Sequence, residues 1–268
     1  MVYSAKSDAV GTISQFTRRK AIKITTSGTS TPTNYQIKVT IVYETVMNVN
    51  FNDIRFNSKN GVYIDYWIES YTASTTATVW LELPDAITDP GSDSIWMYYG
   101  NAAVSDAGNG NNTFIQYQGA TSTPFTLSPV ATNIVVRFSF DPTGTDYIGA
   151  TANAPFGGDM IYWEVVNGST ASKPTVYNNN VYTQNTKTIT LPTTDIYDFY
   201  LVSATSCKYY QNGNLIDTIT TYVPDANLGL FLYTGGNVNY AFMRKYITIE
   251  PTATLGTAQH QRRVATFL

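Results

Sequence analysis

The feature that most constrains this chain is a succession of short segments in which apolar and polar residues alternate, separated by Gly, Pro and Asn. Clear examples are residues 20–25, 35–43, 77–83 and 133–140. A period of two matches a β-strand, whose successive side chains point to opposite faces of a sheet. Short strands between turn residues are typical of β-sandwiches, and no segment predicts a helix of two turns.

Turn residues and chain length indicate how these strands are grouped. Asn212-Gly213 supplies the two positive φ angles of a type I′ turn, so residues 207–218 predict a hairpin. A chain of 268 residues can form two domains with separate cores. The Asn- and Gly-rich segment 101–112 interrupts the alternation and marks the boundary.

We therefore predict an all-β chain of two tandem antiparallel β-sandwich (jelly-roll-like) domains. The first covers residues 1–110, the second covers 111–256, and residues 257–268 form an exposed C-terminal tail.

Composition and patterning exclude several classes of partner. Charged residues make up 13% of the chain and the net charge is -3, which is too little positive charge to bind nucleic acid through its phosphates. The chain has no long apolar run, so membrane insertion is not predicted. The lone Cys207 has no partner for a disulfide, and the single His260 lies in the predicted tail. Activation of a nucleophile by histidine is therefore not expected.

The expected location follows from the polar surface. A chain rich in Thr, Asn and Tyr with few charges is typical of extracellular and virion proteins. Because no signal peptide is visible, we expect a protein that is made in a cytoplasm and leaves it in a particle. The predicted location is a virion surface, or otherwise the extracellular space or cell surface.

The first half carries a family resemblance on six segments in order. These are residues 19–24, 34–39, 51–56, 66–69, 79–84 and 97–101. On them, residues 18–114 resemble the domain of unknown function 2341 family, a β-sandwich family of archaeal and bacterial surface proteins and their viruses.

The second half resembles a different fold. The strand-Asn-Gly-strand unit at 208–218 and the closing segment 242–251 are similar to concanavalin A-like or LamG-like jelly rolls. The two resemblances imply surface modules but no reaction, because the first family has no assigned activity and the second fold hosts lectins, adhesion modules and glycosidases.

A glycosidase on this scaffold would need a specific pattern of acidic residues. Such enzymes carry Glu-x-Asp-x-(x)-Glu on one strand, and the comparable strand here is residues 159–164. Ile161 occupies the middle position, and Glu164 points away from the face that Asp159 and Trp163 share. We therefore predict no catalytic residues and a protein that is not an enzyme.

Carbohydrate binding is the predicted activity of the second domain. Flat aromatic rings stack on sugar C–H groups, and neighbouring amides bind hydroxyls. The candidates are Trp163, Tyr177, Tyr209, Tyr210, Asn212, Tyr233 and Asn237. The alternatives are an inter-sheet core position for Trp163 and turn positions for the asparagines. We expect Trp67, Trp80 and Trp96 to be core residues of the first sandwich.

No cofactor and no metal site are predicted. Loops 85–93 and 141–146 could bind calcium through their aspartates, but Asx turns explain the presence of these aspartates equally well.

The predicted function is that of a non-enzymatic surface structural or attachment protein. It would be a virion component such as a turret, spike or fibre, and would bind a host surface glycan or neighbouring virion or surface-layer proteins. We expect a homo-oligomer, because surface appendages use symmetry to gain avidity. The alternative is a secreted carbohydrate-binding module or adhesin of a cell, or a glycosidase-like carbohydrate-active protein.

Overall fold

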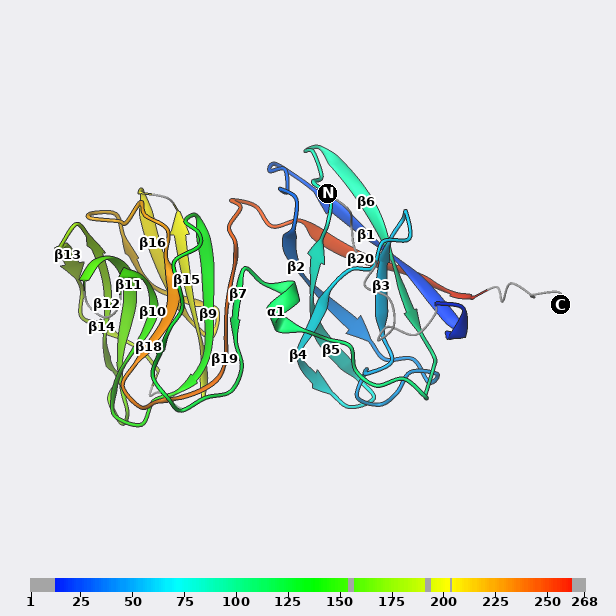
Figure 1. The fold of residues 1–268 in the computed structure, drawn as a ribbon, viewed down its shortest axis with the longest axis horizontal. Helices are drawn as coiled ribbons and strands as arrows, with labels where there is room; N and C mark the ends of the chain where they lie inside the picture. Colours follow the sequence, from blue (N-terminus) through cyan, green and yellow to red (C-terminus); the bar gives the residue numbers. More distant parts are fainter. Residues whose placement is uncertain (1–12, 154–156, 191–193, 203, 262–268) are drawn as a thin grey trace. The chain divides into compact units, whose positions relative to one another are not determined.

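The structure, a computed structural model, describes residues 13–153, 157–190, 194–202 and 204–261. It confirms the all-β prediction, since its described elements are strands apart from the short turns η1 (Ile13–Gln15) and α1 (Gly110–Thr113) (Figure 1). Within the described residues, no helix has the length and apolar character needed to cross a membrane. The chain divides into two compact units, one of residues up to Thr113 together with those from Ile247, and the other Phe114–Tyr246.

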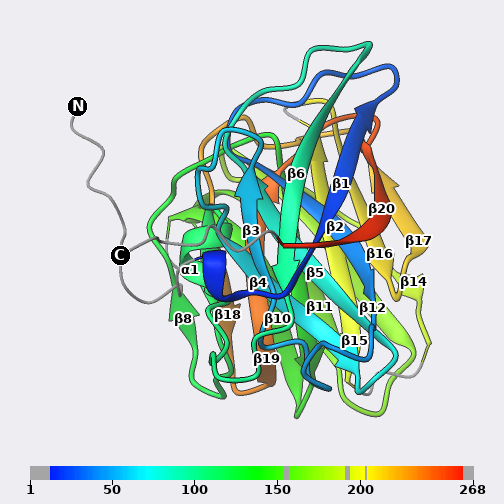
Figure 2. The same ribbon diagram turned by 90° about the vertical axis from the view of Figure 1, so that its right-hand side faces the viewer.

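The first unit is a sandwich of two antiparallel sheets (Figure 2). One sheet has the spatial order β20 (Thr252–His260), β1 (Arg18–Thr26), β6 (Gly91–Tyr99) and β3 (Arg55–Ser58). The other has the order β2 (Tyr35–Val42), β5 (Thr76–Leu83) and β4 (Tyr66–Thr72). Alternate apolar residues such as Ile24, Ile37, Val79 and Ile95 form the core between them, as a period of two requires.

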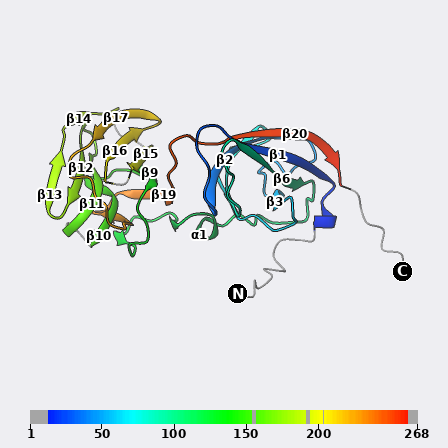
Figure 3. The same ribbon diagram turned by 90° about the horizontal axis from the view of Figure 1, so that it is seen from above.

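The end of the chain departs from the predicted domain limits. Strand β20 pairs with β1 in the first unit, with Arg18 opposite His260 (Figure 3). Residues 247–256 therefore lie in the first unit and not in the second sandwich, and residues 257–260 are strand and not tail. The second unit is inserted into the first, close to the predicted boundary at residue 110.

The second unit is also a sandwich of two antiparallel sheets. One sheet has the spatial order β13 (Val181–Gln184), β12 (Ala171–Asn178), β11 (Gly157–Val166), β10 (Thr145–Asn153), β18 (Gly229–Tyr233) and β8 (Phe125–Thr126). Strand β14 (Lys187–Thr188) also pairs with β12. The order of the other sheet is β17 (Asn214–Ile219), β16 (Ser206–Gln211), β15 (Asp195–Val202), β9 (Ile134–Asp141), β19 (Asn237–Lys245) and β7 (Gln116–Gln118).

The core of the second unit is aromatic. Trp163 is fully buried, and its ring meets the edges of Tyr197 and Tyr209 at centroid distances of 5.3 and 5.6 Å. The Tyr209 hydroxyl donates to the carbonyl of Thr175 at 2.5 Å, which joins the two sheets through the core. Edge-to-face ring pairs add stability beyond the area that they bury.

Asparagines close the two hairpins that flank this core. Asn212 and Gly213 both have positive φ, as the sequence predicts for this turn. Asn179 and Asn180 have φ angles of 50 and 66°, so they form the turn between β12 and β13. The amide of Asn212 is also occupied, because it donates to Asp195 at 2.6 Å and accepts from the backbone of Ile196 at 2.9 Å.

The tryptophans of the first unit fit the core prediction only in part, because Trp80 is buried but lies outside the cluster between the sheets, and Trp67 and Trp96 are half-buried. Trp67 and Trp80 face each other across β4 and β5, on the side opposite to the core residues Tyr66 and Leu81. Trp96 is half-buried under the guanidinium of Arg19, at 4.2 Å from its ring centroid.

Cys207 provides a test of the second core. It is fully buried, and burial raises the pKa of its thiol to about 12. Only the thiolate reacts with disulfide or alkylating reagents, so we expect labelling of the folded chain at pH 8 to be on the order of a thousandfold slower than in denaturant. Stopped-flow labelling with a chromogenic disulfide measures this, and equal rates would contradict the described core.

Candidate functional site

The outer face of the sheet that runs from β13 to β8 is lined with aromatic side chains in register. In one row across the sheet, Tyr182, Tyr177 and Met160 lie opposite one another on neighbouring strands. The ring centroids of Tyr177 and Tyr182 are 4.8 Å apart with a 22° angle between planes, so the two rings stack. Tyr182 is 54% exposed and thus presents a flat ring to solvent at this edge.

Two further rows continue the pattern toward β18. Tyr162 and Phe231 lie on either side of Gly149, and Tyr147 faces Tyr233 across β10 and β18. A Cβ atom on Gly149 would lie 2.1 Å from the carbonyl oxygen of Ile161, so the backbone of β11 leaves room only for glycine at this position. The aromatic face consists of Tyr147, Tyr162, Tyr177, Tyr182, Phe231 and Tyr233.

Contacts among these rings fix the face. Met160, Tyr162 and Phe231 form a buried cluster that is separate from the inter-sheet core, with Tyr147 and Tyr177 packed against it. Tyr147 contacts Tyr162 edge-on at 5.7 Å. Because the rings hold one another, the face is a preformed surface, which lowers the entropy cost of binding a ligand.

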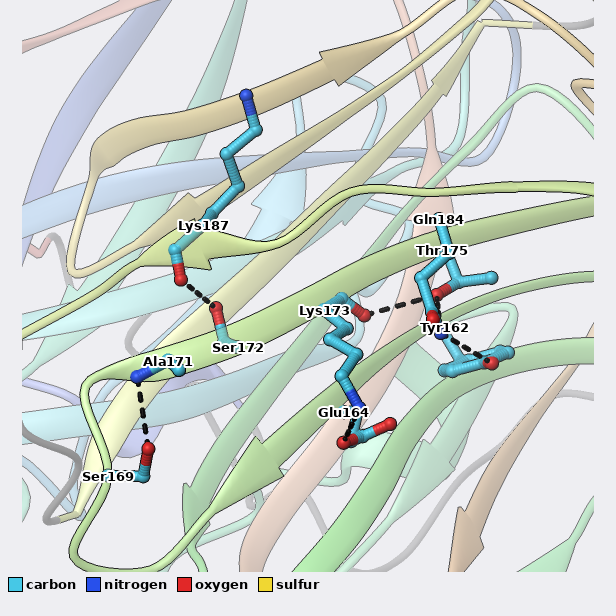
Figure 4. Close-up of polar contacts among 9 residues, drawn as sticks. All are labelled: Tyr162, Glu164, Ser169, Ala171, Ser172, Lys173, Thr175, Gln184 and Lys187. Atoms are coloured by element: carbon cyan, nitrogen blue, oxygen red, sulfur yellow. Dashed lines mark hydrogen bonds and ion pairs between the residues drawn. The ribbon is translucent and has the colours of Figure 1, made fainter.

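Polar side chains of neighbouring strands lie near Tyr162 (Figure 4). Glu164 accepts a hydrogen bond from the ammonium of Lys173 at 2.6 Å. The Gln184 amide donates to Thr175 at 3.1 Å and to the Tyr162 hydroxyl at 3.4 Å. The face therefore offers hydrogen-bonding groups at the edges of its apolar rings.

Protonation of the phenols is secured by their surroundings. Burial, and secondarily the nearby Glu164 carboxylate, raises the pKa of Tyr147, and burial raises the pKa of Tyr162 well above that of a free phenol. A free phenol is already neutral at physiological pH, so these shifts extend the neutral, hydrogen-bond-donating form of both hydroxyls to more alkaline pH.

Of the sequence candidates, Tyr177 and Tyr233 lie on the aromatic face. Trp163 and Tyr209 do not, because both are fully buried between the sheets, where no ligand reaches them. These two assignments are wrong, and the predicted alternative of a core position holds for Trp163.

The remaining candidates lie elsewhere in the second unit. Tyr210 lies on the other sheet, with its ring 5.0 Å from that of Tyr200. Asn212 is a turn residue whose amide is used in the hairpin. Asn237 is exposed at the start of β19, opposite Asp141.

Several members of the face were missed by the sequence argument. Tyr147 lies on β10, a strand that small residues such as Gly149 and Ala150 make hard to detect. Tyr182 lies beside Tyr177 only because the Asn179-Asn180 turn folds β13 back onto β12. The alternation of Tyr162 and Trp163 along β11 was the available signal, since adjacent strand residues face opposite sides.

The aspartates of the loops that were considered for calcium bind protein groups. Asp146 is buried, and its carboxylate accepts from the backbone of Thr143 at 2.9 Å and Gly236 at 3.1 Å, and from the Thr234 hydroxyl at 2.7 Å. Asp93 forms an ion pair with Lys59 at 2.8 Å. Protein groups therefore engage the carboxylates of Asp146 and Asp93.

A family model described as a domain of unknown function (DUF2341) matches residues 50–128. This match includes four of the six segments that carry the family resemblance, from 51–56 onward, and it excludes the segments 19–24 and 34–39. No curated protein sequence is significantly similar to the chain.

Among solved structures, the chain is similar to a galectin, LEC-6, from Caenorhabditis elegans, with 13% identity, a TM-score of 0.38, and coverage of 47% of this chain and 94% of the galectin. It is similar to the carbohydrate binding module CBM66 from Bacillus subtilis with 7% identity and a TM-score of 0.34, over 53% and 98% of the two chains. A Bacillus licheniformis beta-glucanase has 14% identity and a TM-score of 0.33, over 82% and 98%.

Proposed function

We propose that the second unit binds a glycan on the aromatic face. The observation that carries this proposal is the set of ordered rings, two of them at least 40% exposed, interspersed with amide, hydroxyl and charged groups. Sugar rings present C–H groups that stack on aromatic rings, while their hydroxyls need donors and acceptors nearby. From β13 to β18 the face spans roughly 19 Å, taking about 4.8 Å per strand spacing, which favours an oligosaccharide over a single sugar.

Binding without hydrolysis is part of the proposal. Glycoside hydrolysis uses two carboxyl groups across the scissile bond. On the three rows of the face, Glu164 supplies the one carboxylate, and Lys173 holds it in an ion pair at 2.6 Å. Incubation of the purified chain with every glycan that it binds should release no product, whereas turnover would favour the glycosidase-like alternative.

We expect the Tyr177→Ala/Tyr182→Ala variant to bind the selected glycan at least about tenfold more weakly, because each aromatic contact contributes about 0.5–1.5 kcal/mol. The glycan is first chosen on an array, and the affinity is then measured by calorimetry. Tyr210→Ala is the matched control, since Tyr210 lies on the other sheet. Equal losses in both variants, or no loss in the first, would count against the aromatic face.

For the whole chain, we propose attachment at a surface. The low fraction of charged residues, 13%, and the two sandwich units support a structural or attachment protein of a virion that meets a host glycan or neighbouring subunits as a homo-oligomer. The alternative is a secreted module or adhesin of a cell. Immunolabelling of particles and of culture medium from the source separates the two, since label on capsids supports the first and label confined to medium or cell wall supports the second.

A further inference from the structure

A hollow of about 490 Å³ lies in the first unit, far along the chain from the aromatic face. Asn50, Asn52, residues 68–71 and Asp106 line this hollow, which we call the Asp106 pocket. Its volume is in the range of small-molecule sites. All of its lining residues fall inside the segment that the DUF2341 model matches.

A β-bulge builds one wall of the Asp106 pocket. The pairing of β4 with β5 shifts register between Ile68 and Ser70. Ile68 packs against the core between the sheets, while the Glu69 carboxylate accepts a hydrogen bond from the indole of Trp80 at 2.9 Å. The bulge at Glu69 interrupts the regular alternation of this strand beside the hollow, and bulges are common next to binding sites.

A strained loop builds the second wall. Phe51 is fully buried with a φ of 60°, a conformation that bulky residues rarely adopt and that must be held by its surroundings. Its ring contacts Tyr71 at 6.4 Å. Because Phe51 turns into the core, its neighbours Asn50 and Asn52 line the pocket. The buried carboxylate of Asp53 fixes this loop by accepting from the backbone of Asn48, Gly100 and Asn101.

Buried groups also position Asp106. Arg55 is 1% exposed and donates to the carbonyl of Ser105 at 2.6 Å and to the Tyr66 hydroxyl at 3.1 Å. Tyr66 in turn donates to Oδ1 of Asp106 at 3.1 Å, and the backbone of Gly108 donates to the same oxygen at 2.9 Å. These bonds hold one carboxylate oxygen of Asp106, a residue that lines the hollow.

From this geometry we propose that the Asp106 pocket is a second glycan site, specific for neutral saccharides. The Asn50 and Asn52 amides donate, the Asp106 carboxylate accepts, and the Tyr71 ring, 52% exposed, offers a stacking surface. Sugar hydroxyls both donate and accept, so they match this mixed set. The lining contains carboxylates and no Lys or Arg, so it repels an acidic sugar. Within the described residues, no group of three or more His, Cys, Asp or Glu could hold a metal there.

The test uses the whole chain with the Tyr177→Ala, Tyr182→Ala, Tyr147→Ala and Tyr233→Ala substitutions, which remove the four partly exposed rings of the aromatic face. An array of neutral, amine-bearing and acidic glycans is probed with this background, and with Asp106→Asn or Tyr71→Ala added to it. We expect a neutral glycan to be retained by the background and to bind about tenfold more weakly after either addition. Asp106→Asn keeps an oxygen for Tyr66, and Tyr71 is exposed, so thermal unfolding should stay close to that of the background.

Several outcomes would overturn the proposal. The background could retain no neutral glycan, its binding could survive both added substitutions, or acidic glycans could bind best. Loss of binding in a chelator would instead assign the pocket to a cation. The two proposals fail separately, because Tyr71 and Asp106 belong to the first unit and the rings of the aromatic face belong to the second.

Discussion

Replacement of Trp163 by alanine is expected to lower the free energy of unfolding of the second unit by about 3–5 kcal/mol. The side chain is fully buried and its ring touches Tyr197, Phe199 and Tyr209 edge-on. Removing it loses these contacts and leaves a cavity that the surrounding strands cannot fill. Urea unfolding, followed by labelling of Cys207, measures the change in this unit.

A second substitution separates the core position from a binding role. Among the described residues, Nε1 of Trp163 has no hydrogen-bond partner. Trp163→Phe removes this unpaired donor and keeps an aromatic ring, so we expect less than half the loss of stability and unchanged glycan affinity. A stable Trp163→Ala chain that no longer binds glycan would show that Trp163 contributes to binding and not only to the core.

Replacement of Arg55 by methionine is expected to destabilise the first unit by at least about 3 kcal/mol, because it leaves buried acceptors without a donor. Arg55 donates to the carbonyls of Asn52 and Ile54 at 3.0 and 2.7 Å, to Ser105 and to the Tyr66 hydroxyl. Tryptophan fluorescence during urea unfolding reports on this unit when it is recorded in a Trp163→Phe background, where Trp67, Trp80 and Trp96 are the remaining tryptophans.

The control is Arg55→Lys, which retains a positive charge but cannot reach several acceptors at once. We expect it to recover only part of the lost stability. A lysine variant as stable as the natural chain would show that charge alone matters at this position, and an unchanged methionine variant would contradict the described network.

Much of the fold follows from local signals. The alternation of residues 35–43 and 77–83 predicts β2 and β5, and Asn212-Gly213 predicts the β16–β17 hairpin, because both signals arise within a few residues. Strand β20 gives no such signal, since its side chains are mostly exposed and its partner β1 lies at the other end of the chain. Pairing at this sequence separation depends on the assembled sheet.

The site was only partly predictable for a similar reason. Alternation shows that Tyr162 and Trp163 face opposite sides, but not which side becomes the core. That depends on the second sheet, which supplies Tyr197 and Tyr209 as partners for Trp163. Tyr147 and Tyr233 become neighbours only through the pairing of β10 with β18.

The Asp106 pocket was not predictable at all. It depends on a register shift at Glu69 and on the left-handed conformation of Phe51. Glu and Phe residues do not by themselves predict a bulge or a left-handed backbone, because contacts with the rest of the sandwich fix both conformations.

The most direct test of the central claim is a crystal structure of the chain with the glycan that the array selects. We predict sugar rings stacked on the aromatic face, in contact with Tyr177 and Tyr182 or with Tyr147 and Tyr233. A glycan held only on the opposite sheet around Tyr210, or only in the Asp106 pocket, would contradict binding by the aromatic face.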